Sequence, residues 1–307
     1  MQKSKLILDF LDEEQDYSDG KEMEEKMIKS LKSSNSQEAI KKMCEVDSSC
    51  PVLTNLSPDR ENLLSWYPFN RNESLLEIGS GWGALTGLFC EKLGKVTAIE
   101  LTKRRSEITA LRNKERANLT VIAGNTSRVV LDEKFDYVTS VGILEYAGIY
   151  TKSANPYLDF LKELKGFLKD NGTIIIAIEN KFGLKYWSGS AEDHNGDFFE
   201  SIQNYPTERG VRTFGKKEMT DLLVSVGFDD INFYYPLPDY RFPVEIFSDE
   251  YLPTINHNIR AGISSLSDFQ RKKINLFDNR LASDNIIMNE NFDFFANSFL
   301  IFAKEKK

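Results

Sequence analysis

A short glycine-rich stretch carries the clearest chemistry of this sequence. Glu77, Gly79, Gly81 and Gly83 follow the pattern E-x-G-x-G-x-G, directly after a short apolar run. Glycine has no Cβ atom, so the backbone N–H groups of such a turn can come close to a bound ligand. The pattern predicts a turn between a buried strand and a helix, and this turn is expected to hold a nucleotide-like cofactor.

A second acidic residue, Glu100, ends the next apolar run, Val96–Ile99. A carboxylate at the carboxyl end of a strand can accept hydrogen bonds from both hydroxyls of a ribose. Dinucleotide-binding folds space their glycines G-x-G-x-x-G, and an anion at Glu77 would repel their pyrophosphate. The same anion would attract the ammonium group of an amino acid. The pattern therefore favours S-adenosylmethionine over NAD.

The stretch 77–83 resembles motif I of the class I S-adenosylmethionine-dependent methyltransferases, and Glu100 matches the ribose-binding acid of that family. Stretches that resemble the third, fourth and fifth strands of the family follow in order, at 119–125, 135–142 and 172–178. The resemblance implies a Rossmann-like α/β fold. Its sheet is expected to have seven strands, mostly parallel, in the order 3-2-1-4-5-7-6, with helices on both faces. The alternative is a glycine-rich turn of another α/β protein.

The resemblance also implies cofactor contacts beyond the glycine turn. Asn125 stands where the family usually places an acid or amide that contacts the adenine. Segments before the first strand often fold over the cofactor in this family. Arg60 is therefore expected to bind the carboxylate of the cofactor, and Tyr67 is expected to line the pocket. A surface arginine and a core tyrosine are the alternatives. The other residues expected at the cofactor are Leu101, Thr126 and Gly142.

The rest of the chain is expected to be accessory structure around one domain. Residues 1–65 are polar with apolar residues at roughly helical spacing, which predicts a helical cap. Residues 66–307 form the methyltransferase domain, with insertions at about 182–214 and 236–293. Both insertions are longer than the minimal fold requires, and long connections at the carboxyl edge of an α/β sheet usually bind ligands.

The composition limits the classes of molecule that the protein is expected to bind. The chain of 307 residues has a formal net charge of −8, which disfavours nucleic acid as a partner. The basic run Lys103-Arg104-Arg105 is expected to be a solvated helix face, with RNA as a secondary possibility. The three cysteines and two histidines lack metal-ligand spacing, so no metal is expected. No apolar run approaches the roughly 20 residues of a membrane span, and no signal pattern is visible, which predicts a cytoplasmic protein.

The acceptor site is expected in the insertions. Methyl transfer to a hydroxyl needs a base, and histidine suits this role at neutral pH. His194 is the first candidate, beside Asp193 and Glu192, whose charges could raise its pKa. Glu145 and Glu179 are rival bases or acceptor-binding residues. The insertion aromatics are expected to line the acceptor or, alternatively, to anchor the insertions. The residues expected to contact the acceptor are Glu179, Asn180, Tyr186, Tyr240 and Arg241.

The stretches 179–187, 192–194 and 234–243 resemble a group of bacterial methyltransferases that accompany glycosyltransferases in surface polysaccharide synthesis. This resemblance implies O-methylation of a sugar hydroxyl or a glycan-linked group, with glycosyltransferases of the same pathway as partners. Two alternatives stay open. One is a methyltransferase of a small metabolite or a peptide, and the other is a binding protein that keeps the cofactor fold without turnover.

Overall fold

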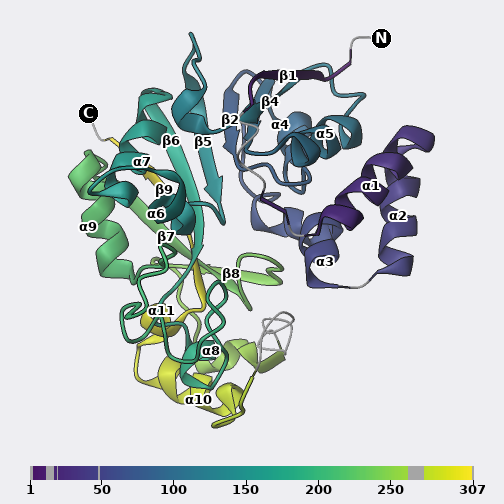
Figure 1. The fold of residues 1–307 in the computed structure, drawn as a ribbon. Coiled ribbons are helices and arrows are strands. Elements are labelled where there is room, and N and C mark those ends of the chain that lie inside the picture. The colour runs from purple at the N-terminus through teal and green to yellow at the C-terminus, as the bar shows by residue number, and fades with distance from the viewer. Residues whose placement is uncertain (1–2, 12–16, 19, 48, 262–272, 306–307) are drawn as a thin grey trace. The chain divides into compact units, whose positions relative to one another are not determined.

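The computed structural model describes residues 3–11, 17–18, 20–47, 49–261 and 273–305 (Figure 1). These residues divide into two compact units. The first unit contains the described residues up to Ser140, together with Gly166–Gly172. The second contains Val141–Lys165 and the described residues from Thr173 onward.

The first unit is built on parallel strands. Along the sheet their order is β1-β4-β3-β2-β5, and each neighbouring pair is parallel. The inner strands are almost fully buried, which explains why their sequences are continuous apolar runs. The bounds are β1 Lys5–Phe10, β2 Ser74–Ile78, β3 Lys95–Glu100, β4 Leu119–Gly124 and β5 Phe135–Val141.

Helices of the first unit pack on the glycine-rich stretch. Trp82 of that stretch is fully buried in a cluster with Met27, Leu31 and Leu56 from the amino-terminal helices and Ile108 from α5. The cluster attaches the amino-terminal helices to the turn, and Figure 1 shows α1 and α2 side by side near α5. The bounds are α1 Lys21–Ser33, α2 Ser36–Val46, α3 Cys50–Leu56, η1 Pro58–Leu63, α4 Thr86–Lys92, α5 Lys103–Arg112 and η2 Thr126–Arg128.

The expected helical cap over residues 1–65 is helical from Lys21, but Lys5–Phe10 form the strand β1. A short apolar run is compatible with either state, and here pairing with the edge of β4 decides it. The two backbones come very close at Gly124, where a Cβ atom would lie 2.5 Å from the carbonyl oxygen of Phe10. The division of the chain at residue 65 stays a prediction.

The second unit is built on antiparallel pairs, in the order β6-β9-β7-β8. Its strands are β6 Leu168–Glu179, whose first residues, 168–172, belong to the first unit, β7 Asp230–Leu237, β8 Glu245–Ser248 and β9 Ser298–Lys304. Helix α9 ends at Gly227, whose φ of 94° suits a glycine after a helix. The helical segments are η3 Leu144–Tyr146, α6 Ala147–Tyr150, α7 Pro156–Gly166, α8 Leu184–Trp187, α9 Lys216–Val226, η4 Ile255–His257, η5 Ile259–Ala261, α10 Asn279–Met288 and α11 Phe292–Phe295.

The predicted sheet needs a correction, because nine strands are present rather than seven and their order differs accordingly. The predicted order 3-2-1-4 corresponds to β4-β3-β2-β5, and 5-7-6 corresponds to β6-β9-β7. The additional strands, β1 and β8, each pair with an outermost strand of this set. An edge strand has unpaired backbone groups that a further strand can satisfy, and both additions lie outside the motifs that the sequence displays. The Rossmann-like fold with a mostly parallel sheet is confirmed.

Among the described residues, no helix is long and apolar enough to span a membrane.

Candidate functional site

The glycine-rich turn joins β2 to α4 in the first unit. Gly79, Gly81 and Gly83 have φ angles of 74°, 59° and 75°, a backbone region that favours glycine. A Cβ atom on Gly81 would lie 3.0 Å from Nη2 of Arg105 and 3.2 Å from Oδ1 of Asn55. The middle glycine is therefore required by both its conformation and its surroundings.

Glu100 connects the end of β3 to this turn. Its side chain is 4% exposed, and Oε2 accepts a hydrogen bond of 2.8 Å from the Gly81 N–H. Nε of Arg105 lies 3.8 Å from Oε1, which also accepts a long hydrogen bond of 3.4 Å from the Thr102 N–H. A carboxylate oxygen can accept two hydrogen bonds, which makes the Glu100 side chain suitable for ribose hydroxyls.

Glu77 ties the end of β2 to the first residue of α4. Its Oε2 accepts a hydrogen bond of 2.5 Å from the Thr86 hydroxyl. Burial raises the pKa of Glu77 to about 7, and the charge of Glu100 adds to this effect although the Thr86 hydrogen bond opposes it. A cationic ammonium group near Glu77 would stabilise the charged carboxylate and so offset part of the effect of burial. The amino-acid end of S-adenosylmethionine carries such a group.

The remaining residues expected at the cofactor lie on several segments. Asn125 follows β4, and its Oδ1 accepts a hydrogen bond of 3.1 Å from the Ser127 N–H. Tyr67 packs edge to face on Phe69 and Tyr137, with ring centroids 4.7 and 6.0 Å apart, as its core alternative expects. Arg60 of η1 is buried, Leu101 and Thr126 are half-buried after β3 and β4, and Gly142 belongs to the second unit.

The prediction that the basic residues of α5 face the solvent is wrong for its arginines. Nε of Arg104 donates 2.9 Å to Oε2 of the fully buried Glu24 of α1. Arg112 donates 2.7 Å to the carbonyl oxygen of Asn55 and 3.2 Å to that of Trp82. The basic residues of α5 thus hold the amino-terminal helices and the glycine turn together.

A cluster of ionisable side chains lies in the second unit. Nε2 of His194 is 3.6 Å from Oε1 of Glu145 and 3.9 Å from Oε2 of Glu179. The side chains of Glu145 and Glu179 are each 1% exposed, and that of His194 is 7% exposed. Glu145 comes from η3, Glu179 from the end of β6 and His194 from the connection after α8, so three separate segments build this acidic cluster.

Glu192 fixes the orientation of the His194 ring. Its Oε1 lies 2.8 Å from Nδ1, and its Oε2 accepts hydrogen bonds from the backbone N–H groups of His194 and Asn195 at 2.8 and 2.6 Å. Burial alone would lower the pKa of His194, but the carboxylates of Glu145 and Glu192 beside the ring outweigh burial and hold the pKa well above its usual range. Burial raises the pKa of Glu145.

Asp193, predicted as a partner of His194, is engaged by other side chains. Oδ2 lies 2.6 Å from Nζ of Lys185 and accepts 2.5 Å from the Tyr186 hydroxyl, and Oδ1 accepts 2.8 Å from Arg241. Burial opposes the charge of Asp193, but Lys185 and Arg241 prevail and lower its pKa. Lys185 was missing from the candidates, and Glu192 was expected only as a charge near His194. The acidic pair before His194 was the available signal, but a sequence does not show which of two adjacent acids turns toward the ring.

Other residues expected at the acceptor differ in their placement. Arg241 also bonds Oε1 of Glu179, so it belongs to the acidic cluster. The Asn180 amide donates to the carbonyl oxygens of Phe294 and Ala296, each at 2.8 Å, which ties β6 to α11. Tyr240 is buried, with its hydroxyl 2.8 Å from where a Gly142 Cβ would lie.

Aromatic residues of the first insertion anchor it. The Phe182 ring stacks on Phe294 with centroids 5.1 Å apart, and Trp187 packs on Phe295 at 6.3 Å. These contacts agree with the alternative that the aromatics hold the insertion on α11.

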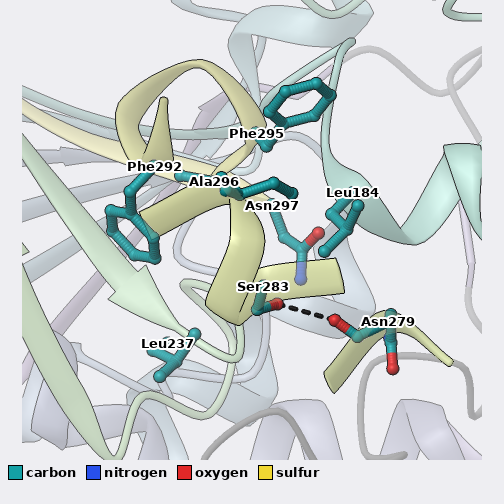
Figure 2. A pocket seen from close by; sticks show the side chains of 9 residues that line it. Leu184, Leu237, Asn279, Ser283, Phe292, Phe295, Ala296 and Asn297 are labelled. Atoms are coloured by element: carbon teal, nitrogen blue, oxygen red, sulfur yellow. Dashed lines mark hydrogen bonds between the residues drawn. The ribbon is translucent and has the colours of Figure 1, made fainter. Parts of the chain in front are cut away.

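A small cavity nearby is too small for an acceptor (Figure 2). Its volume of about 30 Å³ has room for little more than a water molecule. Ser283 on its wall already donates its hydroxyl hydrogen to the Asn279 carbonyl oxygen at 2.7 Å. The remaining lining residues are Leu184, Leu237, Ile286, Phe292, Phe295, Ala296 and Asn297.

Residues 76–176 match a family model described as a methyltransferase domain. Ribosomal RNA small subunit methyltransferase A of Syntrophus aciditrophicus (strain SB) is 35% identical over 71 residues, which are 23% of either chain. Phosphoethanolamine N-methyltransferase 1 of Haemonchus contortus is 14% identical, with a TM-score of 0.52 over 92% of this chain and 49% of that chain. A possible histamine N-methyltransferase of Thermotoga maritima is 16% identical, with a TM-score of 0.47 over 81% and 88% of the two chains.

The matched segment begins within β2 and ends within β6, so it contains the glycine turn, Glu100 and Asn125. It confirms the prediction of a class I S-adenosylmethionine-dependent methyltransferase domain, and with it the predicted cofactor. The match to the curated relative spans less than a quarter of that protein's length. The phosphoethanolamine N-methyltransferase, at a TM-score of 0.52, shares the fold, and the acceptor has to be inferred from this chain's own residues.

Proposed function

We propose that the chain as a whole is an S-adenosylmethionine-dependent methyltransferase. The observation that supports this most directly is the hydrogen bond from the Gly81 N–H to Oε2 of Glu100, which brings the ribose-binding acid onto the glycine turn. Bound there, S-adenosylmethionine supplies a methyl group on a sulfonium centre. Glu100 would hold the ribose, and Glu77 would pair with the ammonium group.

The acceptor is proposed to bind the acidic cluster of the second unit. Transfer to a hydroxyl forms a carbon–oxygen bond and breaks the carbon–sulfur bond, whose electron pair stays on sulfur. The hydroxyl proton leaves to the carboxylate of Glu145. His194, predicted as the base, lies 3.6 Å away and is held in its protonated form by the surrounding carboxylates, so it serves as their cation. Arg241 positions Glu179 by donating a hydrogen bond to its Oε1, and Glu192 positions the His194 ring through Nδ1.

We propose a sugar hydroxyl or a glycan-linked group as the acceptor, with glycosyltransferases as partners and the cytoplasm as the location. Hydrogen-bond acceptors on the cluster suit a polyhydroxylated molecule, and the stretches 179–187, 192–194 and 234–243 resemble methyltransferases of polysaccharide synthesis. Nucleic acid is disfavoured because Arg104 and Arg112 of α5 form hydrogen bonds within the first unit.

Transfer of a labelled methyl group tests this proposal. The purified protein is incubated with methyl-labelled S-adenosylmethionine and, in parallel, with sugars, oligosaccharides, small amines, peptides and RNA. Label in the carbohydrate fractions with matching release of S-adenosylhomocysteine is expected. Label in an amine, peptide or RNA fraction would support methyltransferase activity and refute the proposal of a glycan acceptor. Binding of the cofactor without transfer to any class would favour the inactive binding protein.

A further inference from the structure

The acidic cluster has the composition of a metal site. The imidazole of His194 and the carboxylates of Glu145 and Glu179 each offer one ligand atom, and these atoms all lie within 4.8 Å of one another. Metal–ligand bonds of about 2.1 Å in a tetrahedral arrangement separate the ligand atoms by roughly 3.4 Å. The observed separations of 3.6 and 3.9 Å from Nε2 to the two carboxylates need only a small contraction. The two carboxylate atoms, which lie within 4.8 Å of each other, need to approach by at most about 1.4 Å.

Two oxygens of this cluster lack hydrogen-bond partners. Oε2 of Glu145 and Oε2 of Glu179 are inaccessible to solvent, and neither accepts a hydrogen bond from the described residues. A buried carboxylate oxygen without a partner is costly, and such atoms call for an explanation. Arg241 already binds Oε1 of Glu179, so its Oε2 is the oxygen left to face His194.

The histidine is oriented as a ligand. With Oε1 of Glu192 at 2.8 Å from Nδ1, the ring places its proton on Nδ1 when it is neutral. The lone pair is then on Nε2, which is the atom near Glu145 and Glu179. A carboxylate that accepts the second N–H of a metal-binding histidine is the usual supporting contact in metal sites.

We propose that Glu145, Glu179 and His194 bind a divalent transition-metal ion such as Mn²⁺, Fe²⁺ or Zn²⁺. An imidazole nitrogen beside carboxylates suits these ions better than Mg²⁺ or Ca²⁺, which prefer oxygen ligands alone. Three protein ligands leave a position for an acceptor oxygen, whose proton a bound ion would make more acidic. That catalytic use depends on the proposed function, whereas binding of the ion does not.

The competing occupant is a positively charged part of the acceptor. An ammonium group would also be attracted by Glu145 and Glu179, and the histidine alone could serve as their counterion as well. An ammonium group does not need the lone pair of Nε2, whereas a metal ion does. Replacing the histidine therefore separates the two: metal binding is lost, and binding of an amine is retained or improved.

Mn²⁺ binding measured by electron paramagnetic resonance, without cofactor or acceptor, tests the site. The protein is prepared free of a histidine tag, because a tag binds metal ions itself. Saturable binding of one Mn²⁺ per chain is expected, together with competition by Zn²⁺ and little competition by Mg²⁺. Absence of saturable binding would overturn the proposal, whatever the outcome for methyl transfer.

Variants locate the ion. Glu179→Gln and His194→Gln are expected to weaken Mn²⁺ binding by at least about 100-fold, and Glu192→Gln by about 10-fold or more. Glu200→Gln is the matched control, since Glu200 is a buried carboxylate of the same unit that bonds Thr207 instead of the cluster. Undiminished binding in Glu179→Gln and His194→Gln would place the ion elsewhere and refute this site. S-adenosylmethionine titrations of the same samples report separately on the cofactor and on folding.

Discussion

The glycine turn of the first unit and the acidic cluster of the second differ in how they are encoded. The turn is a continuous stretch whose neighbours are fixed by the strand before it and the helix after it, with Glu100 one strand away. The cluster takes Glu145, Glu179 and His194 from three segments separated by 15 or more residues. A site of the first kind is visible in the sequence, whereas a site of the second kind appears only when the fold brings its parts together.

The two regions also treat charge differently. In the turn, the buried acids Glu77 and Glu100 accept hydrogen bonds from the Thr86 hydroxyl and the Gly81 N–H, and Arg105 lies 3.8 Å from Glu100. In the cluster, the charged side chains of Glu192, Asp193 and Arg241 lie around Glu145, Glu179 and His194. The turn is thus suited to recognising one cofactor, and the cluster is suited to holding or moving a proton or a cation.

The largest expected effect separates the chemistry of the cluster from cofactor binding. His194→Gln is expected to lower turnover with the acceptor found by the label screen about 1,000-fold, because a group that exchanges a proton or orients the acceptor is lost. The dissociation constant of S-adenosylmethionine should change less than about twofold. Release of S-adenosylhomocysteine and calorimetry measure the two quantities, with Glu200→Gln as the control. Normal turnover in His194→Gln would remove the cluster from the reaction.

The pH dependence of stability sharpens the account of the turn. The folded pKa of Glu77 is about 7 against an ordinary value of 4.5, so the folded state binds the proton more tightly. The resulting stabilisation is fully present below about pH 4.5 and is lost as the pH rises through about 7, a change of about 3 kcal/mol in the cofactor-free protein.

Glu77→Gln removes this titration. Denaturant unfolding at pH 5 and pH 8 is expected to show a free energy of unfolding that falls by about 2.5 kcal/mol less in the variant than in the wild type. Equal pH dependence in both proteins would show that Glu77 is not buried as described.

Glycine at position 81 is expected to matter through the backbone. Gly81→Ala keeps a positive φ and moves a Cβ atom to within 3.0 Å of Arg105, which should cost about 1–2 kcal/mol of stability. Gly166→Ala is the matched control, because nothing lies within 4 Å of its Cβ position. Thermal unfolding compares the two, and equal stability would contradict the geometry of the turn.

The smallest expected effect concerns the adenine. Oδ1 of Asn125 already accepts from Ser127, so only the amide hydrogens are left for a cofactor. Asn125→Ala is therefore expected to weaken S-adenosylmethionine binding about fivefold, the value of one ordinary hydrogen bond. A hundredfold loss in calorimetry would mean that Asn125 has a larger role than a strand-end amide.

The sequence predicts the inner strands well, because β2, β3 and β9 are buried apolar runs with clear ends. It misses β1, since a six-residue edge strand resembles one turn and a half of a helix until β4 is there to pair with it. It also misses the engagement of Arg104 and Arg112, because Glu24 and Asn55 lie far away in the chain. At the cluster it finds His194, but the choice between Asp193 and Glu192 depends on Lys185 and Arg241.

Calorimetric titration of S-adenosylmethionine into the wild type, Glu100→Ala and Glu179→Gln tests the central claim most directly. The wild type is expected to bind one molecule per chain. Glu100→Ala should bind about 100-fold more weakly, since it loses two hydrogen bonds to a charged group, and Glu179→Gln should bind as the wild type does. Wild-type binding of NAD instead, or equal affinity in Glu100→Ala, would contradict the assignment of the glycine turn to this cofactor.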